Sequence, residues 1–320
     1  MTYPSVTVIC LCYNHEQFLV EALDSVLAQT YPNLEIIVAD DASTDQSVAI
    51  ILNYCQRYPQ IKFVRNTQNV GNCTAFNLAL KQATGTYIID FATDDVMLPE
   101  RITEQVTCFE KLSPEYGVIY SDAELIDEDS QHIRNFYRRN QAGALKPKAV
   151  SGEIYADVLA RYFICTPTLM FRKVVLDRLN GYDSSLAYED YDFLVRAARE
   201  YKFYFQDKIL TKRRKHSQSL SAGWYKVGDK QLLSTIQVCY KALKLNRTEQ
   251  DKQALIQRVE WETQQAFFTQ NYPEAEALLA LLKQVKPFSL KNKFFKILIN
   301  YRVNLSFIHR FYYWLVHRQP

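Results

Sequence analysis

The sequence predicts an α/β fold, with a parallel sheet up to about residue 222 and a helical region over residues 223–320. Two observations support this prediction. Over the first hundred residues, short apolar runs alternate with segments whose apolar residues recur at helical spacing. After about residue 223, by contrast, the chain is almost entirely helix-permissive. Strands and helices that alternate at this spacing form right-handed βαβ units, and such units place their strands parallel.

The predicted elements follow one another in a regular order. The strands are "SVTVICLC", "LEIIVA", "IKFVRN" and "TYIIDF", which cover residues 5–12, 34–39, 61–66 and 86–91. The helices between them are "NHEQFLVEALDSVLAQ", "SVAIILNYCQRY" and "TAFNLALKQA". Asn14 and Gln17 have the spacing of a capping box, Ser43 and Thr44 are candidate caps of the second helix, and Gly85 ends the third.

Composition and motif content exclude several classes of protein. With 48% hydrophobic and 23% charged residues the chain is globular, and a net charge of +3 does not by itself indicate a nucleic-acid partner. The seven cysteines do not form metal-binding pairs, which predicts reduced thiols. No GxGxxG follows the first strand and no GxxxxGK[ST] occurs, so a dinucleotide fold or a P-loop is not supported.

The sequence gives no sign of a targeting or membrane-spanning segment. The start "MTYPSVTVICLCYN" lacks a basic region, and no stretch reaches 18 uncharged apolar residues. We therefore expect neither secretion nor a membrane-spanning helix, and a cytoplasmic location.

Polar residues follow three of the predicted strands. Tyr13 comes after the first strand, Asp40 and Asp41 after the second, and Asp94 and Asp95 after the fourth. In parallel sheets, ligands bind beyond the carboxyl ends of the strands, so these side chains should converge. Two adjacent carboxylates repel each other and resist burial, which suggests that a ligand balances their charge.

Several ordered motifs resemble those of the family 2 glycosyltransferases. These are "VTVICLCYNHEQFLVEALDSVLAQTYPNLEIIVADDASTD", "GTYIIDFATDD" and "YEDYDFLVRA", and the resemblance covers roughly residues 5–221. It implies a GT-A fold, that is, a Rossmann-like mixed, mostly parallel sheet, with a C-terminal α-helical extension. It also implies inverting transfer of a sugar from a nucleoside diphosphate sugar, with a UDP-sugar expected, to a hydroxyl of a carbohydrate or lipid-linked acceptor. Surface polysaccharide or glycolipid synthesis is the pathway that such enzymes commonly serve.

The resemblance also assigns roles at the strand ends. Tyr13 would place its ring against the base and Asp41 would accept hydrogen bonds from the base edge, while Asp40 would shape the turn. Asp94 would lie near the ribose and Asp95 would bind the metal. A departing diphosphate gains negative charge, which a divalent cation neutralises, and Mn²⁺ or Mg²⁺ suits carboxylate ligands. The alternatives are a capped turn at "DDASTD" and an exposed acid pair at "TDD" that opens a helix.

Two further candidates lie toward the end of the resemblance. Asp190 matches the base that takes the acceptor's proton, with Glu189 as the next choice. The alternative is that Glu189, Asp190 and Asp192 are ordinary acids in the first turn of a helix. In "RRKHSQSLS", His216 would face the diphosphate, either as a hydrogen-bond donor to a phosphate oxygen or as a further metal ligand. The alternative is a solvated basic loop.

The C-terminal tail is basic and aromatic, since no acidic residue follows Glu276. Its apolar residues predict one helical face, which consists of Leu290, Phe294, Leu298, Tyr301, Leu305, Ile308, Tyr312 and Leu315. Two interpretations stay open. The face packs on the catalytic domain or on a second subunit as a homodimer, or it contacts an anionic membrane at the inner surface as a peripheral protein. The absence of a recognisable binding module argues against nucleic acid.

Two rival functions also stay open. A non-catalytic nucleotide-sugar or carbohydrate binder would share the fold, although Asp41, Asp95 and Asp190 are all present. A sugar nucleotidyltransferase would share the strand-end geometry, but "CLCYNHEQF" lacks the Gly-rich basic loop that binds a triphosphate.

Overall fold

The computed structural model describes residues 3–187, 190–216 and 225–307. The chain forms two compact units. The N-terminal unit contains residues 1–154 and 163–222, and the C-terminal unit contains residues 155–162 and 223–320. The short segment Tyr155–Tyr162 thus groups with the C-terminal helices, although the sequence pattern places it among residues 1–222.

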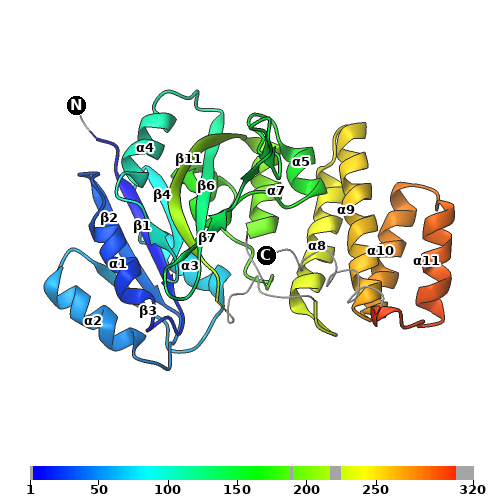
Figure 1. The fold of residues 1–320 in the computed structure, drawn as a ribbon, viewed down its shortest axis with the longest axis horizontal. Coiled ribbons are helices and arrows are strands. Elements are labelled where there is room, and N and C mark those ends of the chain that lie inside the picture. The colour runs from blue at the N-terminus through cyan, green and yellow to red at the C-terminus, as the bar shows by residue number, and fades with distance from the viewer. Residues whose placement is uncertain (1–2, 188–189, 217–224, 308–320) are drawn as a thin grey trace. The chain divides into compact units, whose positions relative to one another are not determined.

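In the described residues, nine strands of the N-terminal unit form one sheet in the order β3-β2-β1-β4-β10-β6-β11-β5, with β7 paired to β6 (Figure 1). The strands β3, β2, β1 and β4 are parallel, and β10 is antiparallel to both of its neighbours. β11 runs parallel to β6, while β5 and β7 are antiparallel edge partners. The predicted mixed, mostly parallel sheet is therefore confirmed.

The strand bounds are β1 Val6–Cys12, β2 Leu34–Asp40, β3 Lys62–Arg65, β4 Tyr87–Ala92, β5 Val96–Met97, β6 Tyr116–Ile126, β7 His132–Asn135, β10 Met170–Arg172 and β11 Lys202–Arg214. A small separate sheet pairs β8 Arg138–Arg139 with β9 Leu145–Lys146.

Helices pack on both faces of the sheet, because each central strand is apolar on both sides. The helices of the N-terminal unit are α1 Leu19–Leu27, α2 Ser47–Arg57, α3 Asn72–Leu80, α4 Arg101–Phe109, α6 Lys173–Arg178 and α7 Asp190–Glu200, with a 3₁₀ turn at Thr166–Thr168. Alternate residues of β1, β2 and β4 share one core with α1, α2 and α4. On the other face, Phe193 of α7 packs edge-to-face against Phe171 of β10 and against Tyr182.

The first two helix starts differ from the prediction. α1 begins at Leu19, without a side-chain cap, and Asn14 instead has a left-handed backbone (φ 55°). Its Oδ1 accepts a hydrogen bond from Thr44 N at 2.8 Å, so Asn14 joins the loops after β1 and β2. α2 begins at Ser47, whose N–H donates to Asp45 Oδ1 at 2.9 Å. Asn14, Ser43 and Thr44 are not helix caps because they bind the neighbouring loop instead.

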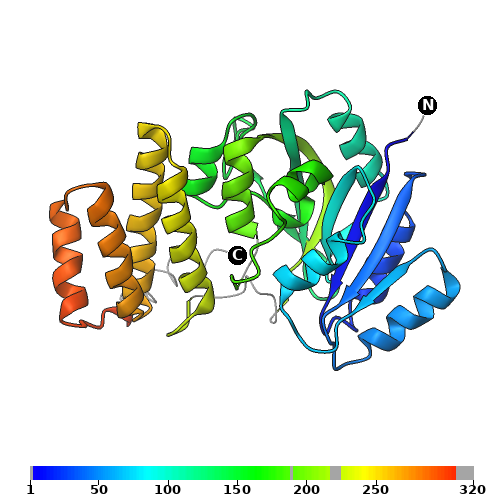
Figure 2. The same ribbon diagram turned by 180° about the vertical axis from the view of Figure 1, so that it is seen from behind.

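The C-terminal unit is helical. It contains α5 Tyr155–Ala160, α8 Lys230–Leu245, α9 Glu249–Phe268, α10 Tyr272–Val285 and α11 Leu290–Asn300. The helices α8 to α11 lie side by side in both ribbon views (Figure 1, Figure 2). A capping box fixes the start of α9, where Thr248 Oγ1 accepts from Asp251 N and Asp251 Oδ2 accepts from Thr248 N.

The single long helix predicted for the tail is wrong. α11 ends at Asn300, and Arg302 has a left-handed backbone (φ 48°) that breaks the helix. The buried side of α11 carries Asn292 and Ile299. Of the described residues of the predicted stripe, Leu290 is 84% exposed, Phe294 and Tyr301 are also exposed, and Leu298 and Leu305 are partly buried. Ile308, Tyr312 and Leu315 lie outside the described residues.

Across the described residues, none of the helices is both long enough and apolar enough to cross a bilayer.

Candidate functional site at the carboxyl edge of the sheet

Strand register brings the predicted strand-end residues to one edge. Cys12 of β1 pairs with Asp40 of β2, and Leu11 pairs with Ala92 of β4. The next residue of each strand therefore lies at the same level, and the ladder continues there. Asp41 N donates to Cys12 O at 2.9 Å, and Thr93 N donates to Leu11 O at 3.0 Å. The loops that carry Tyr13, Asp41 and Asp94 are thus neighbours, as the parallel sheet predicts.

On the β2 side of this edge, Tyr13 is exposed and Asp41 is buried. The carboxylate of Asp41 accepts three hydrogen bonds at 2.9 Å, from Asn66 Nδ2, Val70 N and Gly71 N. Asp41 therefore fixes the loop between β3 and α3. A carboxylate has about four acceptor positions, so Asp41 retains capacity for one further donor.

Asp40 has a local role. Its Oδ2 accepts from Ser43 N at 3.0 Å, which forms an Asx turn after β2. This contact matches the turn-shaping role expected for Asp40.

Asp94 lies beside two histidines. His216 Nε2 and Asp94 Oδ2 are 3.0 Å apart in a hydrogen bond. The ring of His15 lies 6.5 Å from the ring of His216, and its Nδ1 is 2.9 Å from Thr93 Oγ1. The other oxygen of Asp94, Oδ1, is buried and has no hydrogen-bond partner in the described residues. A buried carboxylate oxygen without a partner is costly unless a ligand occupies it.

Asp95 points into a different environment. It is 3% exposed, and its Oδ1 accepts a hydrogen bond from Arg214 N at 2.7 Å, across the β5–β11 edge. The Arg214 side chain is also buried and donates to Asp94 O and Asp127 O, both at 2.9 Å, and to Glu21 Oε2 at 2.5 Å. Arg214 thus belongs to β11 and holds the TDD turn in place, so at this position the alternative of a solvated basic loop in "RRKHSQSLS" is wrong.

The adjacent carboxyls Asp94 and Asp95 differ in acidity for physical reasons. Burial acts to raise the pKa of Asp94, but the hydrogen bond from His216 and the nearby His15 outweigh it and lower the pKa. Burial and the negative charge of Asp94 raise the pKa of Asp95 well above its ordinary value, and the Arg214 N–H only partly offsets this. Burial also lowers the pKa of His15, although Asp94 partly opposes it. Negative charge therefore concentrates on Asp94.

Asp190 opens α7 and is partly buried. Its Oδ1 accepts from Tyr191 N at 2.7 Å and its Oδ2 accepts from Thr166 Oγ1 at 3.0 Å, which holds the carboxylate in one orientation. Asp192 in the same turn is bound by Arg196 Nε at 2.7 Å and is buried, so it is committed to a structural pair. Glu189, the second choice for a base, lies outside the described residues.

Asp90 is a residue that the sequence patterns did not single out. It lies on β4, and its Oδ2 accepts from Tyr182 Oη at 2.7 Å. Burial raises its pKa to about 7, the Tyr182 hydrogen bond opposes this, and the charge of Asp190 adds to the rise. The two carboxyls thus interact electrostatically. An acidic residue in the apolar run "TYIIDF" was the available signal.

A divalent cation fits the surroundings of Asp94. Among the residues that the structure describes, no three metal-binding side chains gather at one point. Mg²⁺ and Mn²⁺ sites at phosphates commonly use only one or two protein ligands, with phosphate oxygens and water completing the shell. The unpartnered Asp94 Oδ1 is a ligand oxygen of that kind, and the imidazole of His216 lies beside the same carboxylate.

Comparison with protein families decides the relationship. A family model described as "Glycosyl transferase family 2" matches residues 7–178, which is more than half of the chain. The chain belongs to glycosyl transferase family 2. This family 2 member is 32% identical to an uncharacterized glycosyltransferase of Rickettsia typhi, over 67% of this chain and 64% of that protein. It thus covers slightly less than two thirds of that relative's length. An uncharacterized glycosyltransferase of Methanocaldococcus jannaschii is 29% identical, over 67% of this chain and 72% of its own length.

Solved structures confirm the GT-A-like fold. Staphylococcus aureus TarS residues 1–349, in complex with UDP-GlcNAc, has a TM-score of 0.69 and 19% identity and covers 88% of this chain and 82% of its own. The mannosyltransferase PcManGT of Pyrobaculum calidifontis, in complex with GDP-Man and Mn²⁺, has a TM-score of 0.58 and 17% identity and covers 94% and 86%. At these identities the likeness concerns the fold alone.

Proposed function

We propose that this family 2 member is a metal-dependent inverting glycosyltransferase that uses a nucleoside diphosphate sugar. The observation that carries the proposal is the joint placement of Asp41, Asp94 and His216 at the carboxyl edge of the sheet. A buried acceptor for a base, an anionic centre for the cation that binds a diphosphate, and a fixed carboxylate at Asp190 are the parts that sugar transfer needs. Among the structures of the same fold, TarS was solved with UDP-GlcNAc and PcManGT with GDP-Man, and we propose a UDP-sugar as the donor here.

Each residue would have a separate task. Tyr13 offers an exposed ring for stacking with the base, and Asp41 accepts from the base edge while it holds the loop after β3. Asp190 takes the proton from the acceptor hydroxyl as that oxygen attacks the sugar carbon on the face opposite the leaving diphosphate, which inverts the carbon. Thr166 keeps Asp190 oriented through its hydrogen bond.

The contacts favour Asp94, with His216, as the carboxylate that holds a divalent cation. Asp94 carries a buried oxygen without a partner and the negative charge, whereas Oδ1 of Asp95 already accepts from Arg214 N and the carboxyl of Asp95 has a raised pKa. This proposal differs from the assignment that the sequence suggests, in which Asp95 binds the metal. When bound, Mn²⁺ or Mg²⁺ would neutralise the charge that develops on the diphosphate.

The test is a panel of nucleotide sugars with and without Mn²⁺. We expect one donor to be hydrolysed slowly without acceptor, in a metal-dependent reaction, and the product to have the inverted anomeric configuration by NMR. Thermal shift with the matching nucleoside diphosphate should depend on the metal in the same way. Metal-independent binding, or no binding by any nucleotide, would refute the proposal.

A non-catalytic nucleotide-sugar binder is the rival function, and Asp190 discriminates between the two. In an enzyme, Asp190→Asn should lose turnover and keep nucleotide binding. A binder would show no turnover with any donor and acceptor, while metal-dependent nucleotide binding persisted.

We also propose a peripheral contact between α11 and an anionic membrane. Leu290, Phe294 and Ile297 are exposed apolar residues on α11. Three exposed lysines lie among them, at Lys291, Lys293 and Lys296. This combination suits the surface of an anionic bilayer, which would keep a lipid-linked acceptor within reach.

A further inference from the structure

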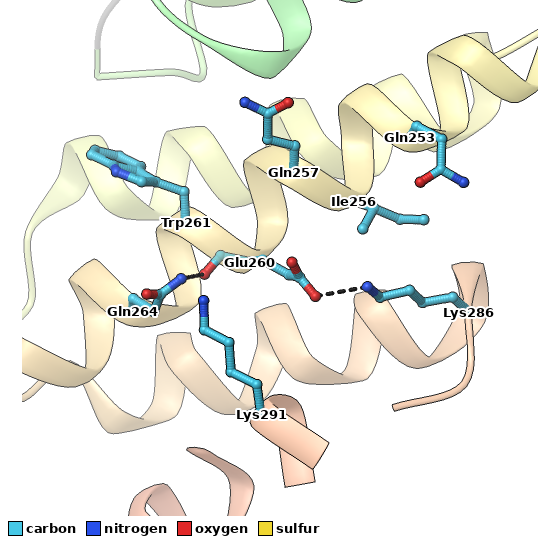
Figure 3. Close-up of a pocket in the computed structure, with 8 residues that line it drawn as sticks. All are labelled: Gln253, Ile256, Gln257, Glu260, Trp261, Gln264, Lys286 and Lys291. Atoms are coloured by element: carbon cyan, nitrogen blue, oxygen red, sulfur yellow. Dashed lines mark hydrogen bonds and ion pairs between the residues drawn. The ribbon is translucent and has the colours of Figure 1, made fainter. Parts of the chain in front are cut away.

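The C-terminal unit carries a hollow of about 500 Å³ that is lined entirely by residues of that unit. Its size lies within the range of small-molecule sites, roughly 300–1,000 Å³. Residues of α9 provide most of the lining, Lys286 follows α10 and Lys291 belongs to α11 (Figure 3). The lining consists of Gln253, Ile256, Gln257, Glu260, Trp261, Gln264, Lys286 and Lys291.

One exposed row on α9 gives this hollow its chemistry. Gln253, Gln257 and Trp261 are four residues apart, so they occupy successive turns of one helix face. All three are exposed, and the Trp261 side chain is large and apolar yet 50% exposed. Figure 3 shows Gln257 and Trp261 projecting from the same side of the helix. The Arg258 guanidinium lies over the indole of Trp261, 5.6 Å from the ring centroid, and the exposed half of Trp261 is available to stack on a ligand.

The other side of the hollow is held rigidly. Glu260 Oε1 accepts from Lys286 Nζ at 2.7 Å and from Asn292 Nδ2 at 2.9 Å. Gln264 Nε2 donates to Glu260 O at 2.8 Å. Lys291, whose amino group points toward Glu260 in Figure 3, has no ion pair within the part of the chain that the structure describes. The two lysines and one carboxylate leave a net charge of +1 in the lining.

These groups match the surface of a saccharide. The apolar C–H face of a pyranose ring stacks on an indole, and planar amides donate to and accept from neighbouring hydroxyls at once. Ile256 is the sole aliphatic residue of the lining, which is too little apolar surface for a lipid tail or a hydrophobic peptide. We propose that this hollow binds a segment of the acceptor's oligosaccharide chain, and that the excess lysine charge favours a chain with carboxylate or phosphate groups.

This inference rests on the proposed function, because a transferase that extends or decorates a glycan needs to retain its acceptor. A second contact with the chain raises the local concentration of acceptor without taking part in the chemistry. Long acceptors should therefore gain affinity from the hollow, and short ones should not.

The experiment uses Trp261 as its own reporter. The full chain has three tryptophans, and in a Trp224→Phe, Trp314→Phe background Trp261 alone provides the indole fluorescence. This protein is titrated with maltoheptaose as a neutral glycan, with a hyaluronan hexasaccharide as an anionic glycan, and with inorganic phosphate. We expect saturable quenching by the hexasaccharide that is stronger than any change with the heptaose, and none with phosphate.

Variants locate the binding. Gln257→Ala in the reporter background should weaken the binding of the hexasaccharide about tenfold, because the substitution removes an exposed amide and does not disturb the core. Gln284→Ala is the matched control, since Gln284 is an exposed glutamine on α10 outside the hollow. In the protein that keeps Trp224 and Trp314, Trp261→Ala should abolish the binding of the hexasaccharide measured by calorimetry. Circular dichroism checks that each variant keeps its helices.

The outcomes separate the two proposals. Equal quenching by phosphate and by the hexasaccharide, no saturable change with any glycan, or a fluorescence change that follows protein concentration as in a dimer would each overturn the saccharide site. Metal-dependent donor hydrolysis that survives in Trp261→Ala shows that the transferase function stands independently. Saccharide binding in a protein that hydrolyses no donor would support the hollow and contradict the transferase.

Discussion

The carboxyl edge of the sheet and the hollow on α9 offer ligands opposite kinds of surface. At the sheet edge, Asp41, Asp94 and Asp95 are buried or half-buried. Main-chain N–H groups fix Asp41 and Asp95, and the imidazole of His216 holds Asp94. On α9, Gln257 and Trp261 are exposed and need only a helix to align them. Buried charge interacts strongly and specifically, while exposed amides and an indole interact weakly over a larger area. The edge is thus suited to chemistry and the hollow to retention.

The largest effect that would test this contrast is expected at Asp190. Asp190→Asn should lower kcat by about 10²- to 10⁴-fold, because the amide cannot take the acceptor's proton. Nucleotide affinity should stay within about twofold, since Asp190 belongs to the acceptor side. Steady-state kinetics with a metal-dependent donor provide the measurement. Asp177→Asn, which removes a surface ion pair with Lys173, is the matched control and should be nearly neutral.

Next in size is the difference between Asp94 and Asp95. Asp94→Asn should weaken Mn²⁺-dependent nucleotide binding at least about 100-fold, because it removes the charge beside His216. Asp95→Ala should mainly lower thermal stability, because it removes the acceptor of the Arg214 N–H in a buried turn. Calorimetry with and without Mn²⁺ measures the first effect and thermal unfolding the second. If the Asp95 variant lost more Mn²⁺-dependent nucleotide binding than Asp94→Asn, Asp95 would be the metal ligand, as the sequence suggests.

A smaller effect concerns Asp90 and pH. Its pKa rises from 3.8 to about 7 on folding, so the folded state binds the proton more tightly. The contribution of protonated Asp90 to the stability of the folded state is therefore complete below about pH 4, and it is lost as pH rises toward 7. Asp90→Asn keeps an acceptor for the Tyr182 hydroxyl and removes the free-energy cost of ionising a buried carboxyl at higher pH. We expect the variant to gain roughly 1–3 kcal/mol of unfolding free energy over the natural protein between pH 4.5 and pH 8, measured by urea denaturation. If the unfolding free energies of the natural protein and of Asp90→Asn changed with pH in parallel, that result would contradict the raised pKa of Asp90.

The smallest effect is expected on the surface of α11. Replacing Leu290, Phe294 and Ile297 together by serine should reduce sedimentation with phosphatidylglycerol vesicles about fivefold and leave donor hydrolysis unchanged. Leu52→Ser with Val174→Ser removes comparably exposed apolar side chains of the N-terminal unit and serves as the control. Binding should also fall with salt, because the three lysines contribute charge. If the triple variant sediments like the control, α11 does not contact the membrane.

Much of the sheet edge could be predicted from local pattern. Apolar runs of strand length place Tyr13, Asp41 and Asp94 at the ends of β1, β2 and β4, and a parallel sheet brings those ends together. Helix starts were less predictable. Asn14 has the right residue type for a cap, but the loop after β2 competes for its side chain through Thr44.

The contrast between Asp94 and Asp95 could not be predicted in the same way. The two residues are adjacent and chemically identical, so only their partners from distant parts of the chain distinguish them. Arg214 of β11 reaches Asp95 and His216 reaches Asp94, more than a hundred residues along the sequence. Long-range pairing of this kind depends on the register of β11.

By itself, the sequence determined the α/β class, the strand-end positions of the candidate site and the motifs of glycosyl transferase family 2. These follow from local periodicity and from short ordered motifs, which act within a few residues. Tertiary structure alone decided which carboxyl of the TDD pair stays charged, that Asp90 has a raised pKa, and which face of α11 is exposed. Burial and charge depend on which distant segments pack together, and no local pattern specifies them.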